Sequence, residues 1–476
     1  MKYDILDFGA VGDGATLNTE AFRRACDAAR TAPDGAAVIT VPPGVFVSGS
    51  IVLPSNTTLR LEAGAVLKAS ANPDDFLSND EIFPNCPDLP GFTWSSDKRA
   101  STREEWLSLY FIGALHAHDV IIEGDGTIDG TGAAFWEDVC IDGKPWIPND
   151  PWRPVRTRVM KPRKRRPVTV NFWKCHDIAV RGIRIMNAAA YTVWTQGCAN
   201  VRIQDIRIRN PYEGPNTDAL DIDCSENVII SGCDILAGDD CIALKSDTSR
   251  LGEDRPCRNI AVSNCVFSST ACGVRIGYEG DGAITDCAFS NLVVYDSKQA
   301  INLMSLTSIP RPDFVRGTPI ERIQFTNLSM RNVARAFHIW CGTEDGAAAP
   351  YGAHVRDLIF SDINAVTRAG SFIGSKDGAP IRNVQLRNVH IRRDPHALVQ
   401  SLPPADYPGL WGTTDHVADV LRLHRVENLR LDAVDLEFNA PAPSGDLLRW
   451  NSLVHFRRDN ELMPPDGVIA VPRGAE

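Results

Sequence analysis

The apolar positions of this chain recur in pairs of short alternating segments separated by a polar corner. Nearly every copy opens on Asn or Asp, alternates aliphatic and other residues, passes a short polar pair, and alternates again. Alternation with a period of two is typical of short strands, so each copy predicts two strands around a corner. In the copy at Asn227, we expect Val228, Ile230 and Cys233 to point one way. The copies open at Asp119, Asp177, Asn200, Asn227, Asn259, Asp286, Arg322, Asp357, Asn383 and Asn428.

From Asp177 onward, successive copies start 23 to 45 residues apart. One copy cannot bury its apolar side alone, whereas stacked copies share a core and pair their strand edges. The chain therefore predicts an all-β fold, a single-stranded right-handed parallel β-helix of about ten or more coils, with the handedness of parallel crossovers. A leucine-rich repeat is a poorer interpretation because its Leu ladder is missing. A two-sheet sandwich is poorer because tight hairpin signals are few.

The N-terminal part, about residues 1–35, predicts a cap. Apolar residues recur at helical spacing from Thr19 to Arg30, after Asn18 and before Pro33, which predicts a helix over the open end of the core. These helical apolar positions are Ala21, Phe22, Ala25 and Ala29.

No composition break divides the remaining chain, so we expect one β-helix catalytic domain over 1–476. The repeat is missing at about 72–108 and 133–165, which predicts two long loops of the functional kind. Exposed Trp side chains commonly stack on sugars, and the second loop holds Trp136, Trp146 and Trp152. The alternative is that these side chains pin the loop to the coils.

Charge indicates the class of binding partner, and cysteine content indicates the cellular compartment. Eight basic residues lie between Arg153 and Arg166, but the net charge of −11 and the lack of a nucleic-acid-binding motif argue against a nucleic-acid partner. A loop that attracts an anionic sugar is the better interpretation of this basic run. Nine of thirteen cysteines lie between Cys175 and Cys287, without zinc-site spacing, which predicts thiols stacked in the core and a reducing compartment.

The chain opens without a charged-then-apolar leader and holds no apolar run of membrane-span length. We therefore expect a cytoplasmic protein without a membrane partner. A removed leader would make it secreted or periplasmic instead. The sequence does not indicate the oligomeric state.

Two acidic motifs stand one coil apart. Asn216-Thr217-Asp218 precedes Gly238-Asp239-Asp240 by 21 to 22 residues, and residues one coil apart stack about 4.8 Å from each other. Three carboxylates at one groove suit acid/base cleavage of a glycosidic bond. The alternatives are polar corner residues that bond backbone amides, or a calcium site that includes Asp221 and Asp223. Hydrolysis needs neither metal nor cofactor.

Four stretches together resemble one family: Phe8 to Gly14, Val41 to Gly44, Arg166-Pro167 ahead of Trp194, and the two acidic motifs. The chain resembles glycoside hydrolase family 28, the polygalacturonase-like enzymes of the pectin-lyase-like β-helix superfamily. The resemblance implies an inverting hydrolase. It makes Asp239 the general acid, and it makes Asp218 and Asp240 the carboxylates that hold and deprotonate the attacking water. Inversion needs carboxyls roughly 6.5–9.5 Å apart.

The sequence departs from this family at two places. Cys272 stands where members carry the histidine of Gly-His-Gly. Asn302-Leu303-Met304 stands where polygalacturonases carry the Arg-Ile-Lys segment that binds the uronate carboxylate. Arg275 or Lys298 are candidate replacement cations.

The predicted substrate is a pectin-related or other plant-type oligosaccharide or polysaccharide, cleaved in an exo manner because the long loops would close one end of the cleft. Two alternatives stay open: a lyase or epimerase with Lys245 as base, and a non-catalytic carbohydrate-binding solenoid. For His338, the alternative to substrate binding is a purely structural role. The candidate substrate-binding residues are Asn216, Trp194, Asp221, Lys245, Cys272, Arg275 and His338.

Overall fold

The computed structural model describes residues 1–77, 109–138, 140–141, 144–145, 160–162, 165–307, 317–343, 354–376, 381–394, 420–424, 426–438, 440–441, 447–448, 452–453 and 456–457. The chain divides into two compact units. The first unit comprises residues 1–149, 156–242 and 250–254, and the second comprises 150–155, 243–249 and 255–476. Most of the two predicted loops, with Trp146 and Trp152, lies outside the described residues.

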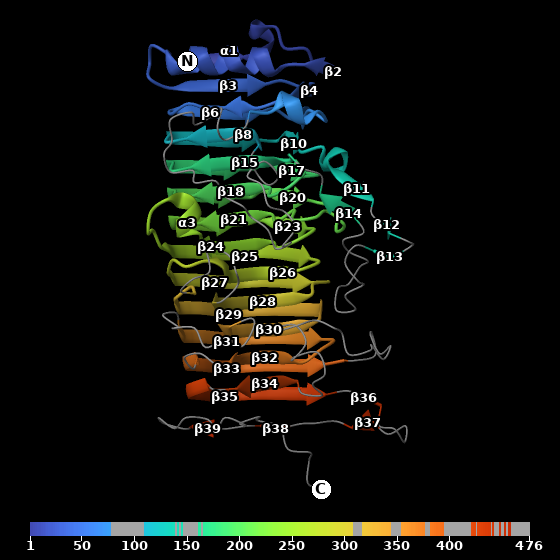
Figure 1. The fold of residues 1–476 in the computed structure, drawn as a ribbon, viewed down its shortest axis with the longest axis vertical. Coiled ribbons are helices and arrows are strands. Elements are labelled where there is room, and N and C mark those ends of the chain that lie inside the picture. Colours follow the sequence, from blue (N-terminus) through green and yellow to red (C-terminus); the bar gives the residue numbers. More distant parts are fainter. Residues whose placement is uncertain are drawn as a thin grey trace. The chain divides into compact units, whose positions relative to one another are not determined.

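Parallel strands build the first unit (Figure 1). We call the sheet that carries the candidate site the front sheet, and the sheet formed by the other parallel strands the back sheet. The front sheet runs in the order β5 (Ile51–Val52), β8 (Leu109–Leu115), β15 (Pro167–Trp173), β18 (Val193–Gln196) and β21 (Leu220–Asp223). The back sheet holds β1 (Lys2–Asp4), β2 (Asp13–Leu17), β3 (Ala37–Val41), β4 (Gly44–Ser48), β6 (Thr57–Leu61), β7 (Ala65–Ala69), β9 (His118–Gly124), β10 (Thr127–Asp129), β16 (His176–Arg181), β17 (Arg184–Met186), β19 (Ala199–Gln204), β20 (Arg207–Arg209), β22 (Glu226–Ser231) and β23 (Asp234–Ala237).

The second unit is built in the same way, with longer strands. Its front sheet runs β24 (Ile242–Ser246), β26 (Cys272–Gly280), β28 (Gln299–Thr307), β30 (Arg335–Thr343), β32 (Ser371–Lys376) and β34 (Leu421–His424). Its back sheet stacks β25 (Cys257–Ser269), β27 (Ile284–Tyr295), β29 (Ile320–Val333), β31 (Val355–Thr367), β33 (Ile381–Arg393) and β35 (Val426–Phe438).

Short elements complete the described chain. They are η1 (Ile5–Phe8), η2 (Pro73–Asp75), η3 (Gly132–Phe135), α3 (Thr248–Leu251), β11 (Trp136–Asp138), β12 (Cys140–Ile141), β13 (Lys144–Pro145), β14 (Met160–Pro162), β36 (Ala440–Pro441), β37 (Leu447–Leu448), β38 (Ser452–Leu453) and β39 (Phe456–Arg457).

The structure explains why the repeat opens on Asn or Asp. All ten predicted starts have left-handed backbone, with φ between 53° and 59°. Asn and Asp tolerate this conformation better than other non-glycine residues. Their side chains also bond from coil to coil. Asn200 Nδ2 donates to Asp177 Oδ1 (2.9 Å) in the first unit, and Asn383 Nδ2 donates to Asp357 Oδ1 (2.6 Å) in the second. A second left-handed row bonds in the same way: Asn327 Nδ2 donates to Asn291 Oδ1 (2.8 Å), and Asn291 Nδ2 donates to Asn264 Oδ1 (3.0 Å).

The predicted alternation is confirmed. Val228, Ile230 and Cys233 are buried, whereas Ile229 between them is 38% exposed. In the second unit, stacked aromatic rings continue the core: the ring centroid of Phe325 lies 4.5 Å from that of Phe289 and 5.5 Å from that of Phe360. Eleven cysteines among the described residues are buried free thiols, as the core interpretation predicts.

The capping helix is confirmed as well. Helix α1 (Thr19–Arg30) buries its four predicted apolar positions and Cys26, and it packs against β3. Asn18 makes no cap bond to the helix. Its side chain instead accepts from the Val11 amide and donates to the Val47 carbonyl, which ties the helix start to the first coils. Among the described residues, no helix combines the length and apolar character needed to cross a membrane.

Candidate active site

Backbone bonds between neighbouring coils bring the two acidic motifs together. The N–H of Ala219 donates to the carbonyl oxygen of Asp240 (2.8 Å), and the N–H of Leu220 donates to that of Cys241 (3.1 Å). In these parallel sheets, a residue whose N–H donates to a carbonyl is paired in register with the residue that follows that carbonyl. For example, the Val193 N–H donates to the Ala219 carbonyl, and Val193 is paired with Leu220.

By the same rule, Ala219 pairs with Cys241. One residue earlier, Asp218 therefore stands opposite Asp240, and Thr217 stands opposite Asp239. Residues paired in this way are separated by about 4.8 Å along the stack. Asp218, Asp239 and Asp240 are all buried, with exposed fractions of 4%, 6% and 3%. Burial strengthens the interaction between charges because the local dielectric constant is lower than in water.

Gly238 permits the two motifs to approach closely. A Cβ atom at this position would lie 2.4 Å from Thr217 Oγ1, 2.5 Å from the Gly214 carbonyl oxygen and 2.6 Å from that of Pro211. Real Cβ atoms essentially never approach other atoms so closely. Only glycine therefore lets the second motif pack against the segment that leads into the first.

Buried polar side chains hold the segment before Asp218. The guanidinium of Arg166 donates to the Pro215 carbonyl and to Asn216 Oδ1 (3.1 Å). Asn210 Nδ2 donates to the Thr217 carbonyl (3.2 Å). Asn216 itself has left-handed backbone, with φ of 53°. Its side-chain oxygen thus accepts from a protein donor, Arg166.

A second group of predicted residues lies on the front sheet of the first unit. Asn171 pairs with Trp194, and Trp194 pairs with Asp221, so these three positions form one row across the sheet. The flanking Leu220 and Ile222 belong to the core. Because successive side chains alternate, the row lies on the opposite face of the sheet from Leu220 and Ile222, where all three of its side chains are buried.

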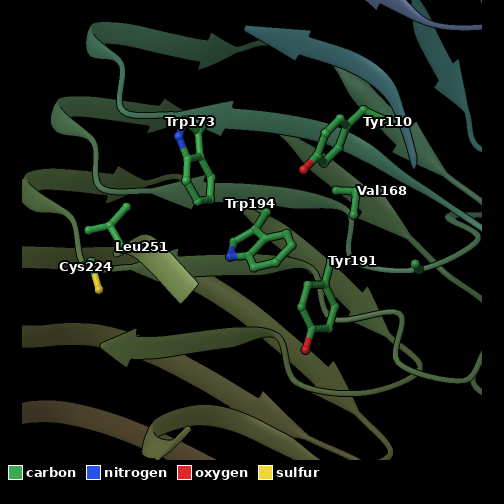
Figure 2. Packing of buried hydrophobic residues seen from close by; sticks show 8 residues of the cluster. Tyr110, Val168, Trp173, Tyr191, Trp194, Cys224 and Leu251 are labelled. Carbon is green, nitrogen blue, oxygen red and sulfur yellow. The ribbon is translucent and has the colours of Figure 1, made fainter. Parts of the chain in front are cut away.

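Trp194 belongs to a buried aromatic cluster (Figure 2). Its indole packs edge-to-face on Tyr191 at 5.2 Å, and Trp173 and Tyr110 belong to the same cluster. Trp136 fits the alternative in which the tryptophans hold the loop to the coils. Its Nε1 donates to the Ala189 carbonyl (2.9 Å), and its ring is buried.

The other predicted residues lie in the second unit. Arg275, Asn302 and His338 are paired in register on β26, β28 and β30, and they form one row of buried side chains. Since the flanking Val274 and Ile276 belong to the core, alternation puts this row on the opposite face of the sheet. Arg275 Nη1 lies 3.7 Å from Met304 Sδ, and its guanidinium lies over the Tyr278 ring.

A buried hydrogen-bonded chain links this row to Cys272. Asn302 Nδ2 contacts His338 Nδ1 (3.0 Å) and Gln299 Oε1. Cys272 Sγ lies 3.4 Å from the same Gln299 oxygen. Burial, and secondarily the positive charges of Arg335, Lys298 and Arg275, hold the pKa of His338 well below its ordinary value. His338 is therefore neutral near pH 7.

Lys245 has a carboxylate partner: its Nζ lies 2.7 Å from Glu279 Oε2, and both side chains are buried. Within the described residues, no three His, Cys, Asp or Glu side chains are arranged to hold a metal ion. The structure thus places Asn216, Asp218, Asp239, Asp240, Asp221 and Trp194 in the first unit, and Lys245, Cys272, Arg275 and His338 in the second.

Comparison with known proteins shows the family of this chain. The family model for glycosyl hydrolases family 28 matches residues 39–403. The chain belongs to this family. It is therefore a glycoside hydrolase, and the predicted family is confirmed.

Relatives and solved structures agree. The chain is 29% identical over 381 residues to a probable polygalacturonase of Vitis vinifera, covering 76% of this chain and 70% of the relative. It is 24% identical to an endo-polygalacturonase of Pectobacterium carotovorum subsp. carotovorum, covering 74% and 78%. Its fold is similar to that of a hyperthermoactive exopolygalacturonase from Thermotoga maritima, with a TM-score of 0.63 at 20% identity over 97% and 95% of the chains. The right-handed parallel β-helix is thereby confirmed.

Sequence reasoning missed two residues of this family 28 site. The sequence indicates Arg166 only as the end of the basic run and as part of the Arg166-Pro167 motif, and it gives no indication of Asn210. Arginine is seldom fully buried, so a sequence offers no reason to place it in the buried contacts that hold the segment before Asp218. The only available signal was its position at the start of β15, directly before Pro167.

Proposed function

We propose that this family 28 enzyme hydrolyses polygalacturonan or a related pectin polymer with inversion of the anomeric carbon. The backbone bond from the Ala219 N–H to the Asp240 carbonyl (2.8 Å), which joins the two acidic motifs, carries the proposal. The relatives named polygalacturonases support the substrate.

Each aspartate has one task. Asp239 gives its proton to the departing glycosidic oxygen while water attacks the opposite face of the sugar. Asp218 and Asp240 orient this water and accept its proton. The cycle closes when that proton returns to Asp239 through solvent.

The test is Asp239→Asn, which leaves the backbone unchanged but removes the transferable proton. We expect turnover of polygalacturonate to be lost while the denaturation midpoint stays near wild type. Asp234→Asn is the matched control, because Asp234 is a half-exposed carboxylate on the preceding strand, paired with Arg209. Retained turnover in Asp239→Asn would rule out the assigned acid. Proton NMR of the first-formed anomer tests inversion independently.

For the charge of the substrate, we propose that Arg275 supplies the cation for a sugar carboxylate. Its guanidinium reaches Met304 on the next coil, so its charge lies beside the segment where a polygalacturonase-like chain carries its own cations. A neutral sugar is the second candidate, favoured by uncharged Asn302 and Met304 and by neutral His338.

Defined galacturonate oligomers and their methyl esters separate these two candidates. If Arg275 binds the carboxylate, Arg275→Met raises KM for the acid about tenfold or more and leaves KM for the ester nearly unchanged. For Arg275→Lys, we expect a KM for the acid between those of the wild type and Arg275→Met. Equal effects on both substrates would favour the neutral sugar.

We also propose exo action, from the two long interruptions of the repeat. The products of a long polymer then appear as the smallest sugars from the first minutes, and the viscosity of the solution falls slowly. Early mid-sized fragments would contradict this. The lyase or epimerase alternative is weakened because its candidate base, Lys245, lies 2.7 Å from Glu279 Oε2 in a buried ion pair. Loss of activity with a chelator would revive it.

A further inference from the structure

Arg166 is a fully buried cation next to the acidic motifs. Its side chain has no exposed surface, although arginine stays charged at any physiological pH. Its Nη1 donates to the carbonyl oxygens of Ala189 (3.2 Å) and Pro215, and its Nη2 donates to Asn216 Oδ1 (3.1 Å). A buried charge is tolerated only when hydrogen bonds replace its lost hydration.

These bonds join two coils of the first unit. Ala189 lies just before β18, and Pro215 and Asn216 lie just before β21. The Ala189 carbonyl is also held by Trp136 Nε1. Arg166 therefore ties the segment that leads into Asp218 to a point that is anchored from a second side.

Asn210 holds the same segment beyond Asn216. Its Nδ2 donates to the Thr217 carbonyl and to Thr192 Oγ1 (2.8 Å), and its Oδ1 accepts from the Ala188 amide (3.0 Å). The backbone on both sides of the left-handed residue Asn216 is thus fixed by buried side chains. The next residue after this fixed stretch is Asp218.

We infer that Arg166 is a positioning residue for Asp218. It holds Pro215 and Asn216 so that Asp218 stands in register with Asp240, and its positive charge favours the ionised form of a carboxylate nearby. The inference rests on the proposed role of Asp218 in accepting a proton from water. It adds that a residue outside the acidic motifs sets both the position and the proton affinity of that base.

The test compares Arg166→Met with Arg166→Lys on polygalacturonate, with kcat measured across pH. We expect Arg166→Met to lower kcat about a hundredfold, since a displacement near 1 Å can cost that much, with little change in KM. The acidic limb of the kcat profile should move to higher pH. Arg166→Lys restores the charge but not the fork of donors, so it should restore the acidic limb more than kcat.

Arg368→Met is the matched control. Arg368 is another buried arginine, with Nη2 on the Ser297 carbonyl (3.2 Å), and its loss should lower stability without moving the pH profile. If Arg166→Met shows the wild-type pH profile, or loses no more kcat than Arg368→Met, the inference is wrong.

A second variant decides the matter should Arg166→Met fail to fold. Asn216→Gly keeps the left-handed backbone at little cost and removes the side chain whose oxygen accepts from Arg166. The inference predicts a lower kcat in this variant too, and an unchanged kcat would overturn it. Activity in Asp239→Asn would instead overturn the proposed function, so the two failures are distinguishable.

Discussion

Replacing Gly238 by Ala tests whether close packing of the two acidic motifs sets the catalytic geometry. The new methyl would lie 2.4–2.6 Å from three atoms of Pro211, Gly214 and Thr217, where ordinary contact starts at 3.4 Å. The segment 211–217 must therefore move by about 0.8–1.0 Å. Two of the three atoms are backbone oxygens, so a rotamer change cannot relieve the overlap.

This displacement falls on the residues directly before Asp218. A misplacement near 1 Å can lower a rate about a hundredfold, which corresponds to about 2.7 kcal/mol of transition-state free energy. Overpacking itself costs roughly 1–3 kcal/mol of unfolding free energy. We expect a large fall in kcat on polygalacturonate with a modest loss of stability.

The assay is kcat and KM under conditions where denaturant curves show the variant to be fully folded. Gly113→Ala is the matched control, because Gly113 lies on the front-sheet strand β8 and its added methyl would meet nothing closer than 3.8 Å. Equal kcat values for Gly238→Ala and Gly113→Ala would refute the argument that this close approach positions Asp218.

Three further predictions concern stability, each read from the midpoint of denaturant unfolding. Phe325→Ala removes a fully buried ring from a three-ring stack and should cost about 3–5 kcal/mol, whereas Val293→Ala at an exposed strand position should change little; similar losses in both would contradict the stacked core. Asn291→Ala should cost about 1–2 kcal/mol because alanine is strained at φ of 54°, and Asn291→Gly should cost less; the reverse order would contradict the left-handed bend. Burial would raise the pKa of Glu321, but hydrogen bonds from His354, Arg356 and Arg322 lower it to about 2. Its stabilising effect is then complete above its unfolded pKa of about 4.3 and is lost as the pH falls toward 2. Glu321→Gln should therefore show a smaller fall in stability between pH 5 and pH 3 than wild type.

Local chemistry along the chain predicted much of this protein. The residues that open each repeat were found because a left-handed backbone selects Asn and Asp one residue at a time. The capping helix and the inward positions of the strands followed from spacing alone. The 21 residues from Asp218 to Asp239 indicated neighbouring coils, because that separation is close to the shortest spacing between repeat copies, 23 residues.

Only the tertiary structure decided which polar side chains are buried and which residues they contact. Arg166 and Arg165 are neighbours in one basic run, yet Arg166 is fully buried and donates to Pro215 and Asn216, while Arg165 pairs with Asp74 at the surface. The pKa of His338 is held well below its ordinary value by burial first, and then by the charges of Arg335, Lys298 and Arg275. These residues come together only because coils more than thirty residues apart stack. Such contacts depend on which coils stack and in which register. Intervening loops of variable length hide that register from any local pattern.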